Sequence, residues 1–107
     1  MWESRMRVGC WFGFAGQMAR FLVEHYLPGS THAERSHDVA LVGEARHILS
    51  TCGTLHVSSL IVDADEMCMH VYDAEAESMV LAAHDAAGLR CDRIVEVRMP
   101  RLAVATA

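Results

Sequence analysis

Seven histidines are the residues of this 107-residue sequence best suited to chemistry. Imidazole is the commonest neutral metal ligand, and it titrates near neutral pH. His70 stands out because it lies in Met67–Tyr72, where apolar and polar residues alternate as they do in a strand. His25 and His56 also fall in segments that we predict to be strands. The arrangement of these strands therefore decides whether the three imidazoles can act together.

Familiar enzyme signatures are absent from the sequence, which has no Gly-rich phosphate loop, no HExxH or GxSxG motif and no nucleophile beside a base. Glu24 and Glu96 could act as a general acid and base if they faced one another. Ion pairing with Arg20 or Arg98 is the simpler role for these carboxylates. The sequence leaves catalysis open and favours a binding protein.

Composition narrows the class of partner. A net charge of -5 without a basic cluster argues against nucleic acid or an anionic membrane. The apolar run at 8–15 is too short and too rich in Gly to cross a bilayer or to direct export. The cysteines show no zinc-site spacing, which predicts reduced thiols in a cytoplasmic protein; they are Cys10, Cys52, Cys68 and Cys91.

The chain length suits one domain, which we place at residues 18–102. A loosely ordered N-terminal extension, residues 1–17, is expected before the domain and a short tail, residues 103–107, after it. The first predicted strand is Ala19–Leu27, ended by Pro28 and Gly29. A helix should follow from Thr31, which forms a capping box with Glu34, and continue to Gly53.

The second half of the chain predicts a hairpin and then a second helix. Leu55–Val62 and Met67–Tyr72 read as strands joined by a short acidic turn. Asp73 is expected to cap a helix that Gly88 ends, and Arg93–Met99 reads as the last strand. The order β-α-β-β-α-β predicts a ferredoxin-like α+β fold, with a four-stranded antiparallel sheet and both helices on one face.

The other sheet face would then be open, and an open apolar face is usually covered by a second copy or a ligand. Side chains alternate across a strand, and we expect the more apolar set to face the helices. That rule assigns to the helices Phe21, Val23, Leu55, Val57, Ile61, Met67, Met69, Val71, Val95, Val97 and Met99. It assigns to the open face Glu24, Tyr26, His56, Ser58, Leu60, Cys68, His70, Tyr72, Ile94, Glu96 and Arg98.

His70 and Glu24 would therefore meet on two adjacent central strands. His25 falls at the margin of the helix side, and a one-residue bulge in the first strand would reverse that strand's assignment. The simpler interpretation of His70 is a polar residue satisfied at a dimer interface. His84 lies near a helix C-terminus, where the helix dipole alone stabilises an imidazolium.

Several short motifs, in order, resemble the small nickel-binding-protein-like domain family, much of which is described only as a domain of unknown function. They are Arg20-Phe-Leu-Val-Glu24, Leu27-Pro-Gly29, Val71-Tyr-Asp-Ala74, Ala83-His-Asp-Ala-Ala-Gly-Leu89 and Asp92-Arg-Ile-Val-Glu-Val97. The resemblance spans residues 18 to about 102. It implies a ferredoxin-like homodimer that binds nickel through His-rich sites without known catalysis. The sequence departs from the family at His70, often Cys there, and at Arg90, often Pro; His in place of Cys shifts metal preference toward nickel, copper or zinc.

The leading hypothesis is a cytoplasmic homodimer, paired through its open sheet face, that binds a divalent transition metal. Nickel is the first candidate and zinc or copper the next, with His70 and Glu24 as ligands and His56 or His25 completing the set. One alternative is a small-molecule-binding protein or enzyme of the dimeric α/β-barrel kind, using Tyr72, His70 and Glu24 in a cavity at the sheet face. Another is an interaction module that only dimerises.

Overall fold

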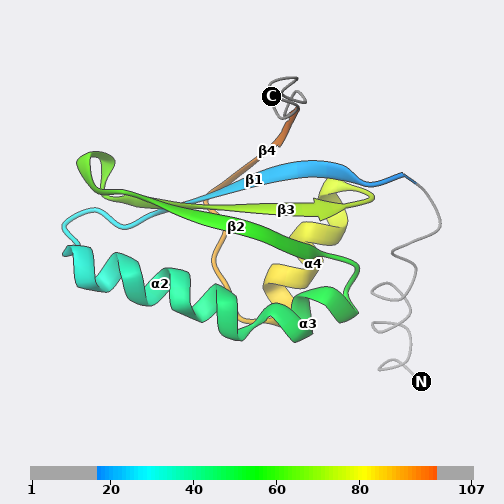
Figure 1. The fold of residues 1–107 in the computed structure, drawn as a ribbon, viewed down its shortest axis with the longest axis horizontal. Helices are drawn as coiled ribbons and strands as arrows, with labels where there is room; N and C mark the ends of the chain where they lie inside the picture. Colours follow the sequence, from blue (N-terminus) through cyan, green and yellow to red (C-terminus); the bar gives the residue numbers. More distant parts are fainter. Residues whose placement is uncertain (1–16, 99–107) are drawn as a thin grey trace, which may run out of the picture.

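A computed structural model describes residues 17–98 of the chain, so nearly all of the predicted extension and the whole of the tail lie outside the described residues. Figure 1 shows one open sheet with helices packed beneath it. The elements in chain order are β1 (Ala19–Tyr26), α2 (His32–Glu44), α3 (Arg46–Thr51), β2 (Leu55–Val62), the 3-10 turn η1 (Asp63–Asp65), β3 (Met67–Ala74), α4 (Glu77–Ala86) and β4 (Arg93–Val97).

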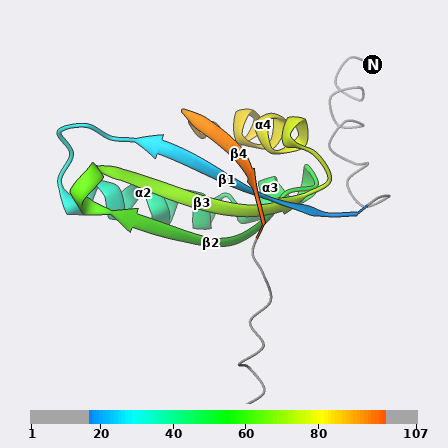
Figure 2. The same ribbon diagram turned by 90° about the horizontal axis from the view of Figure 1, so that it is seen from above.

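The four strands are antiparallel and lie in the order β2-β3-β1-β4, which Figure 2 shows from above. All three helices cover the same face (Figure 1). The predicted ferredoxin-like α+β fold is thereby confirmed. None of the helices in residues 17–98 is long and apolar enough to cross a membrane.

The helix signals in the sequence have mixed outcomes. Thr31 and Glu34 form the predicted capping box, each side chain accepting a hydrogen bond from the other residue's backbone N–H. The single helix expected up to Gly53 is divided at Ala45, where α2 ends and α3 begins. The predicted cap at Asp73 is wrong: β3 continues through Asp73, whose carboxylate pairs with Arg20, and Ala76 is the N-cap of α4.

The hydrophobic core lies between the sheet and the helices. Strands β1 and β3 contribute Phe21, Val23, Tyr72 and Ala74 to this core. The helices and their cap residues contribute Val42, Ala45, Leu49, Cys52, Val80 and Ala83. Burial of these apolar side chains away from water is the main source of stability for such a fold.

The face predicted for β3 is wrong. Cys68, His70 and Tyr72 face the helices, where all three are fully buried, and the register of β1 and β3 pairs His70 with Val23 of the core. Met67, Met69 and Val71 therefore lie on the open face. The physical reason is that the polar atoms of β3 find hydrogen-bond partners on α2 and α4, which removes the cost of burying them.

Two other strands also depart from the predicted alternation. A bulge at Val57 in β2 places His56 opposite Tyr72 and Ser59 opposite His70, so that both face the helices, while Leu55 faces the open side. In β4, Ile94 pairs with Val23 and packs against the core, while Val95 and Val97 lie opposite open-face residues of β1. The register also puts Glu96 opposite Phe21, and not on the open face.

Candidate functional site

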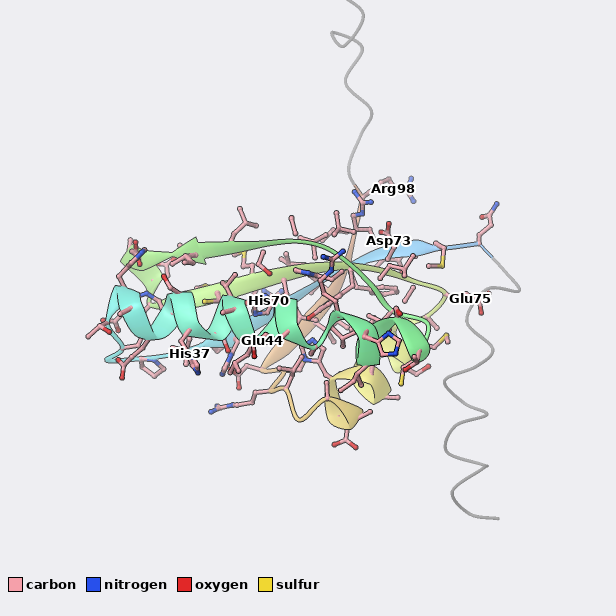
Figure 3. All side chains as sticks on the ribbon, turned by 60° about the horizontal axis from the view of Figure 1, so that its bottom comes forward. His37, Glu44, His70, Asp73, Glu75 and Arg98 are labelled. Carbon is pink, nitrogen blue, oxygen red and sulfur yellow. The ribbon has the colours of Figure 1, made fainter. Side chains whose placement is uncertain are left out.

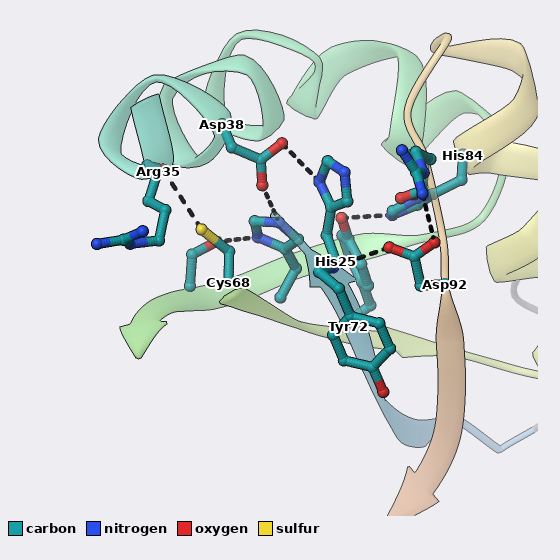
Figure 4. A network of polar contacts seen from close by, with 11 residues as sticks. His25, Arg35, Asp38, Cys68, Tyr72, His84 and Asp92 are labelled. Carbon is teal, nitrogen blue, oxygen red and sulfur yellow. Dashed lines mark hydrogen bonds and ion pairs between the residues drawn. The ribbon is translucent and has the colours of Figure 1, made fainter. Parts of the chain in front are cut away.

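Asp38, on the sheet-facing side of α2, is the centre of a buried polar cluster. Only 8% of this residue is exposed. His25 Nδ1 lies 2.8 Å from Asp38 Oδ1, and His70 Nε2 lies 3.1 Å from Asp38 Oδ2. Figure 4 shows the Asp38 carboxylate reaching from α2 toward His25. The two histidines come from the neighbouring strands β1 and β3. A single carboxylate is thus shared by two histidines.

The cluster continues from His70 into β2. Ser59 Oγ lies 2.7 Å from His70 Nδ1 and is also 2.8 Å from His56 Nε2. The bulge at Val57 makes this possible, because residues three apart on a regular strand face opposite sides. The result is a continuous hydrogen-bonded chain His56–Ser59–His70–Asp38–His25, which we call the histidine chain.

One arrangement of protons satisfies every contact of the histidine chain. An ionised carboxylate only accepts, so His25 Nδ1 and His70 Nε2 both donate to Asp38. A neutral His70 then accepts the hydroxyl hydrogen of Ser59 at Nδ1, and Ser59 accepts from His56 Nε2. Every donor points toward Asp38, so the carboxylate polarises the whole chain.

The pKa of Asp38 reflects a balance of opposing effects. Burial alone would raise it, but the hydrogen bond from His70 and the charge on His25 outweigh burial and leave the pKa below its ordinary value. Burial lowers the pKa of His56, and a proton on His70 or the charge of Arg46 acts in the same direction. Asp38 is accordingly a carboxylate, and His56 a neutral imidazole, at neutral pH.

Tyr72 and His84 form a second buried pair beside the histidine chain. His84 Nδ1 lies 3.2 Å from the Arg90 carbonyl oxygen, which can only accept, so Nδ1 carries the proton. His84 Nε2 therefore accepts the Tyr72 hydroxyl, at 2.7 Å. Burial lowers the pKa of His84 to about 4 and raises that of Tyr72. The helix-dipole explanation predicted for His84 is replaced by a buried, neutral imidazole.

Cys68 adds sulfur beside the cluster. Its thiol donates to the Arg35 carbonyl oxygen of α2 at 3.4 Å (Figure 4). Burial, with the negative charge of Asp38 next in importance, raises the pKa of Cys68 to about 11. The side chain is therefore a protonated thiol at neutral pH, and a poor nucleophile.

Glu24 does not join these residues. It lies opposite Met69 on the open face, where it accepts hydrogen bonds from the Tyr26 hydroxyl and from Arg93. The predicted convergence of Glu24 with His70 is wrong, because the two lie on opposite faces of the sheet. Figure 3 shows His70 on the side toward α2, with Asp73 and Arg98 on the far side of the sheet.

The other three residues predicted as ligands, His25, His56 and His70, do belong to one chain of contacts. Sequence reasoning missed Asp38, although a signal was present. The predicted apolar stripe includes Val42 and Ala45. At the same helical spacing, the next positions toward the N-terminus are Asp38 and Arg35, and both are buried. A polar residue on the buried side of a helix indicates a partner in the sheet.

The donor types of the cluster suit a transition metal, since imidazole nitrogen and carboxylate oxygen bind nickel, copper and zinc. Ligand atoms around such an ion, with bonds of about 2.0–2.1 Å, lie about 2.9–3.4 Å from one another. The two nitrogen-to-oxygen distances at Asp38 are close to this spacing. Between residues 17 and 98, however, no group of three or more His, Cys, Asp or Glu side chains is already arranged to hold a metal ion.

Comparison of the chain with protein-family models, with curated proteins and with solved structures gave no match. The functional conclusion therefore rests on the residues themselves.

Proposed function

We propose that the protein binds a divalent transition metal ion, nickel first, through His25, Asp38 and His70. The observation that carries the proposal is the Asp38 carboxylate shared between two imidazoles beneath α2. His25 Nδ1, His70 Nε2 and an Asp38 oxygen would hold the ion; each imidazole would then carry its proton on its other ring nitrogen, which in His70 would donate to Ser59. The resemblance of residues 18–102 to a nickel-binding family points the same way.

The surroundings of the cluster support this role. Metal-ligating histidines commonly use their second ring nitrogen in a hydrogen bond that fixes the ring. Ser59 makes that bond to His70. Asp38 is ionised and supplies one negative charge near the cation. This charge offsets part of the free-energy cost of burying a cation. Glu24 has no part in this ligand set, because it lies on the other face of the sheet.

Equilibrium dialysis of untagged protein against Ni²⁺ and Zn²⁺ tests the proposal. We expect one ion per chain for the wild type and a large loss of affinity for Asp38→Asn, which keeps the shape of the side chain and removes its charge. His37→Gln, an exposed histidine one residue away on α2, is the matched control and should bind like the wild type. Absence of stoichiometric binding, or equal binding by the Asp38 and His37 variants, contradicts the proposal.

The protein is also proposed to form a homodimer through its open sheet face. This face exposes apolar side chains, including Leu55 and Leu60, the latter 50% exposed. Two of its arginines are already neutralised, since Arg20 pairs with Asp73 on the same face and Arg93 with Glu24. Two copies can therefore meet there without bringing unpaired like charges together.

A second candidate is a small-molecule site between the facing sheets of such a dimer. The observation that favours it is Glu24, only 7% exposed and bonded to Tyr26 and Arg93 on a face that also exposes apolar side chains. Polar groups converging within an apolar wall are typical of ligand pockets. A metal-free dimer with an enclosed cavity at Glu24 would favour this function over metal binding.

A further inference from the structure

The outer end of the histidine chain opens into a hollow on the surface. This hollow, about 360 Å³ in volume, lies between α3 and the start of β2. Its walls are Arg46, His47, Ser50, Leu55 and His56. The volume is at the lower end of the range for small-molecule sites. The Arg46 guanidinium is the strongest hydrogen-bond donor of this lining, which contains no carboxylate.

Arg46 provides a positive charge that the surrounding protein does not use. It is exposed, and within residues 17–98 no Asp or Glu forms an ion pair with it. By contrast, an ion pair with a neighbouring carboxylate neutralises Arg20, Arg35, Arg90 and Arg93. A guanidinium presents several donors in a planar fork that matches a carboxylate or phosphate group.

His56 is held in place beneath Arg46 and needs little ordering to take part in binding. Its Nε2 contacts Ser59, and its ring lies 5.6 Å from the ring of Tyr72, both on the buried side. Leu55, which precedes it, is 41% exposed and forms an apolar wall of the same hollow. A fixed imidazole, a free guanidinium and an apolar wall thus border one space.

We propose that this hollow binds a small organic anion whose oxyanion head group contacts Arg46 while a short apolar body lies on Leu55 and the ring of His56. The proposal is independent of metal binding at Asp38, because the hollow contains none of the proposed metal ligands. Carboxylate and phosphate head groups share the chemistry that Arg46 recognises, and an apolar body distinguishes an organic anion from an inorganic one.

NMR titration of the isotope-labelled full chain, with a metal chelator present, tests the inference using inorganic phosphate, acetate and hexanoate. We expect saturable shifts that centre on Arg46, His47, Ser50 and His56, and tighter binding of hexanoate than of acetate because of contact with Leu55. Arg46→Gln should weaken hexanoate binding about tenfold, as expected for loss of one charged hydrogen-bonding partner.

Arg90→Gln is the matched control, since it removes the same charge from an exposed site after α4 that is already paired. It should leave binding unchanged. The inference is overturned if no saturable shift occurs at these residues, if Arg46→Gln and Arg90→Gln bind alike, or if hexanoate binds no better than acetate.

Discussion

The buried His84 makes stability depend on pH in a defined window. His84 is 2% exposed, and its pKa falls to about 4 from an ordinary 6.5. Because the folded-state pKa is lowered, the unfolded chain takes up a proton first as pH decreases, and the free energy of unfolding drops between about pH 6.5 and pH 4. A difference of about 2.5 pKa units corresponds to about 3 kcal/mol.

The variant His84→Gln isolates this contribution. Glutamine retains an acceptor for the Tyr72 hydroxyl but cannot titrate, so its unfolding free energy should change much less than that of the wild type over the same window. Urea denaturation at several pH values and a fixed protein concentration measures the difference. His56 also has a lowered pKa and leaves a smaller slope in the variant. Equal pH dependence of His84→Gln and wild type would refute the reasoning, as would an NMR pKa for His84 near 6.5.

Two further predictions concern the open face and the first helix. Leu60→Glu adds a charge to the open sheet face at the edge strand β2, and we expect it to convert the proposed dimer to monomer, measured by light scattering after gel filtration; a wild type that is monomeric at every concentration would disprove the dimer. Thr31→Ala removes the side-chain acceptor at the start of α2 and should lower the free energy of unfolding by about 1 kcal/mol in urea denaturation, whereas no change would show that the cap contributes nothing.

The sequence predicted the elements better than their faces. β2 was predicted with the bounds that the structure has, and the capping box at Thr31 was found, because both depend on local signals. The face of β3 could not be predicted from its own residues. Its more apolar set, Met67, Met69 and Val71, lies on the open face, and its more polar set is buried because α2 and α4 supply partners for Cys68, His70 and Tyr72.

The sequence predicted only part of the candidate site, again because the faces of the strands depend on tertiary partners. His25, His56 and His70 were singled out by residue type and strand position, and they share one chain of hydrogen bonds. Glu24 was grouped with them because His70 was predicted to lie on the open face, whereas it faces the helices. Asp38 was overlooked because a carboxylate on a helix is usually solvated, and its position in line with the buried Val42 was not given enough weight.

The bulge at Val57 has a consequence for how the protein can change over evolutionary time. It separates β2 into two short stretches whose inward and outward positions are set independently. Substitutions at Leu55 or His56 can reshape the surface hollow without altering the phase of Ser59, Leu60 and Ile61. Leu55 can therefore vary without affecting the interior cluster, whereas His56 links the surface hollow to the histidine chain through Ser59.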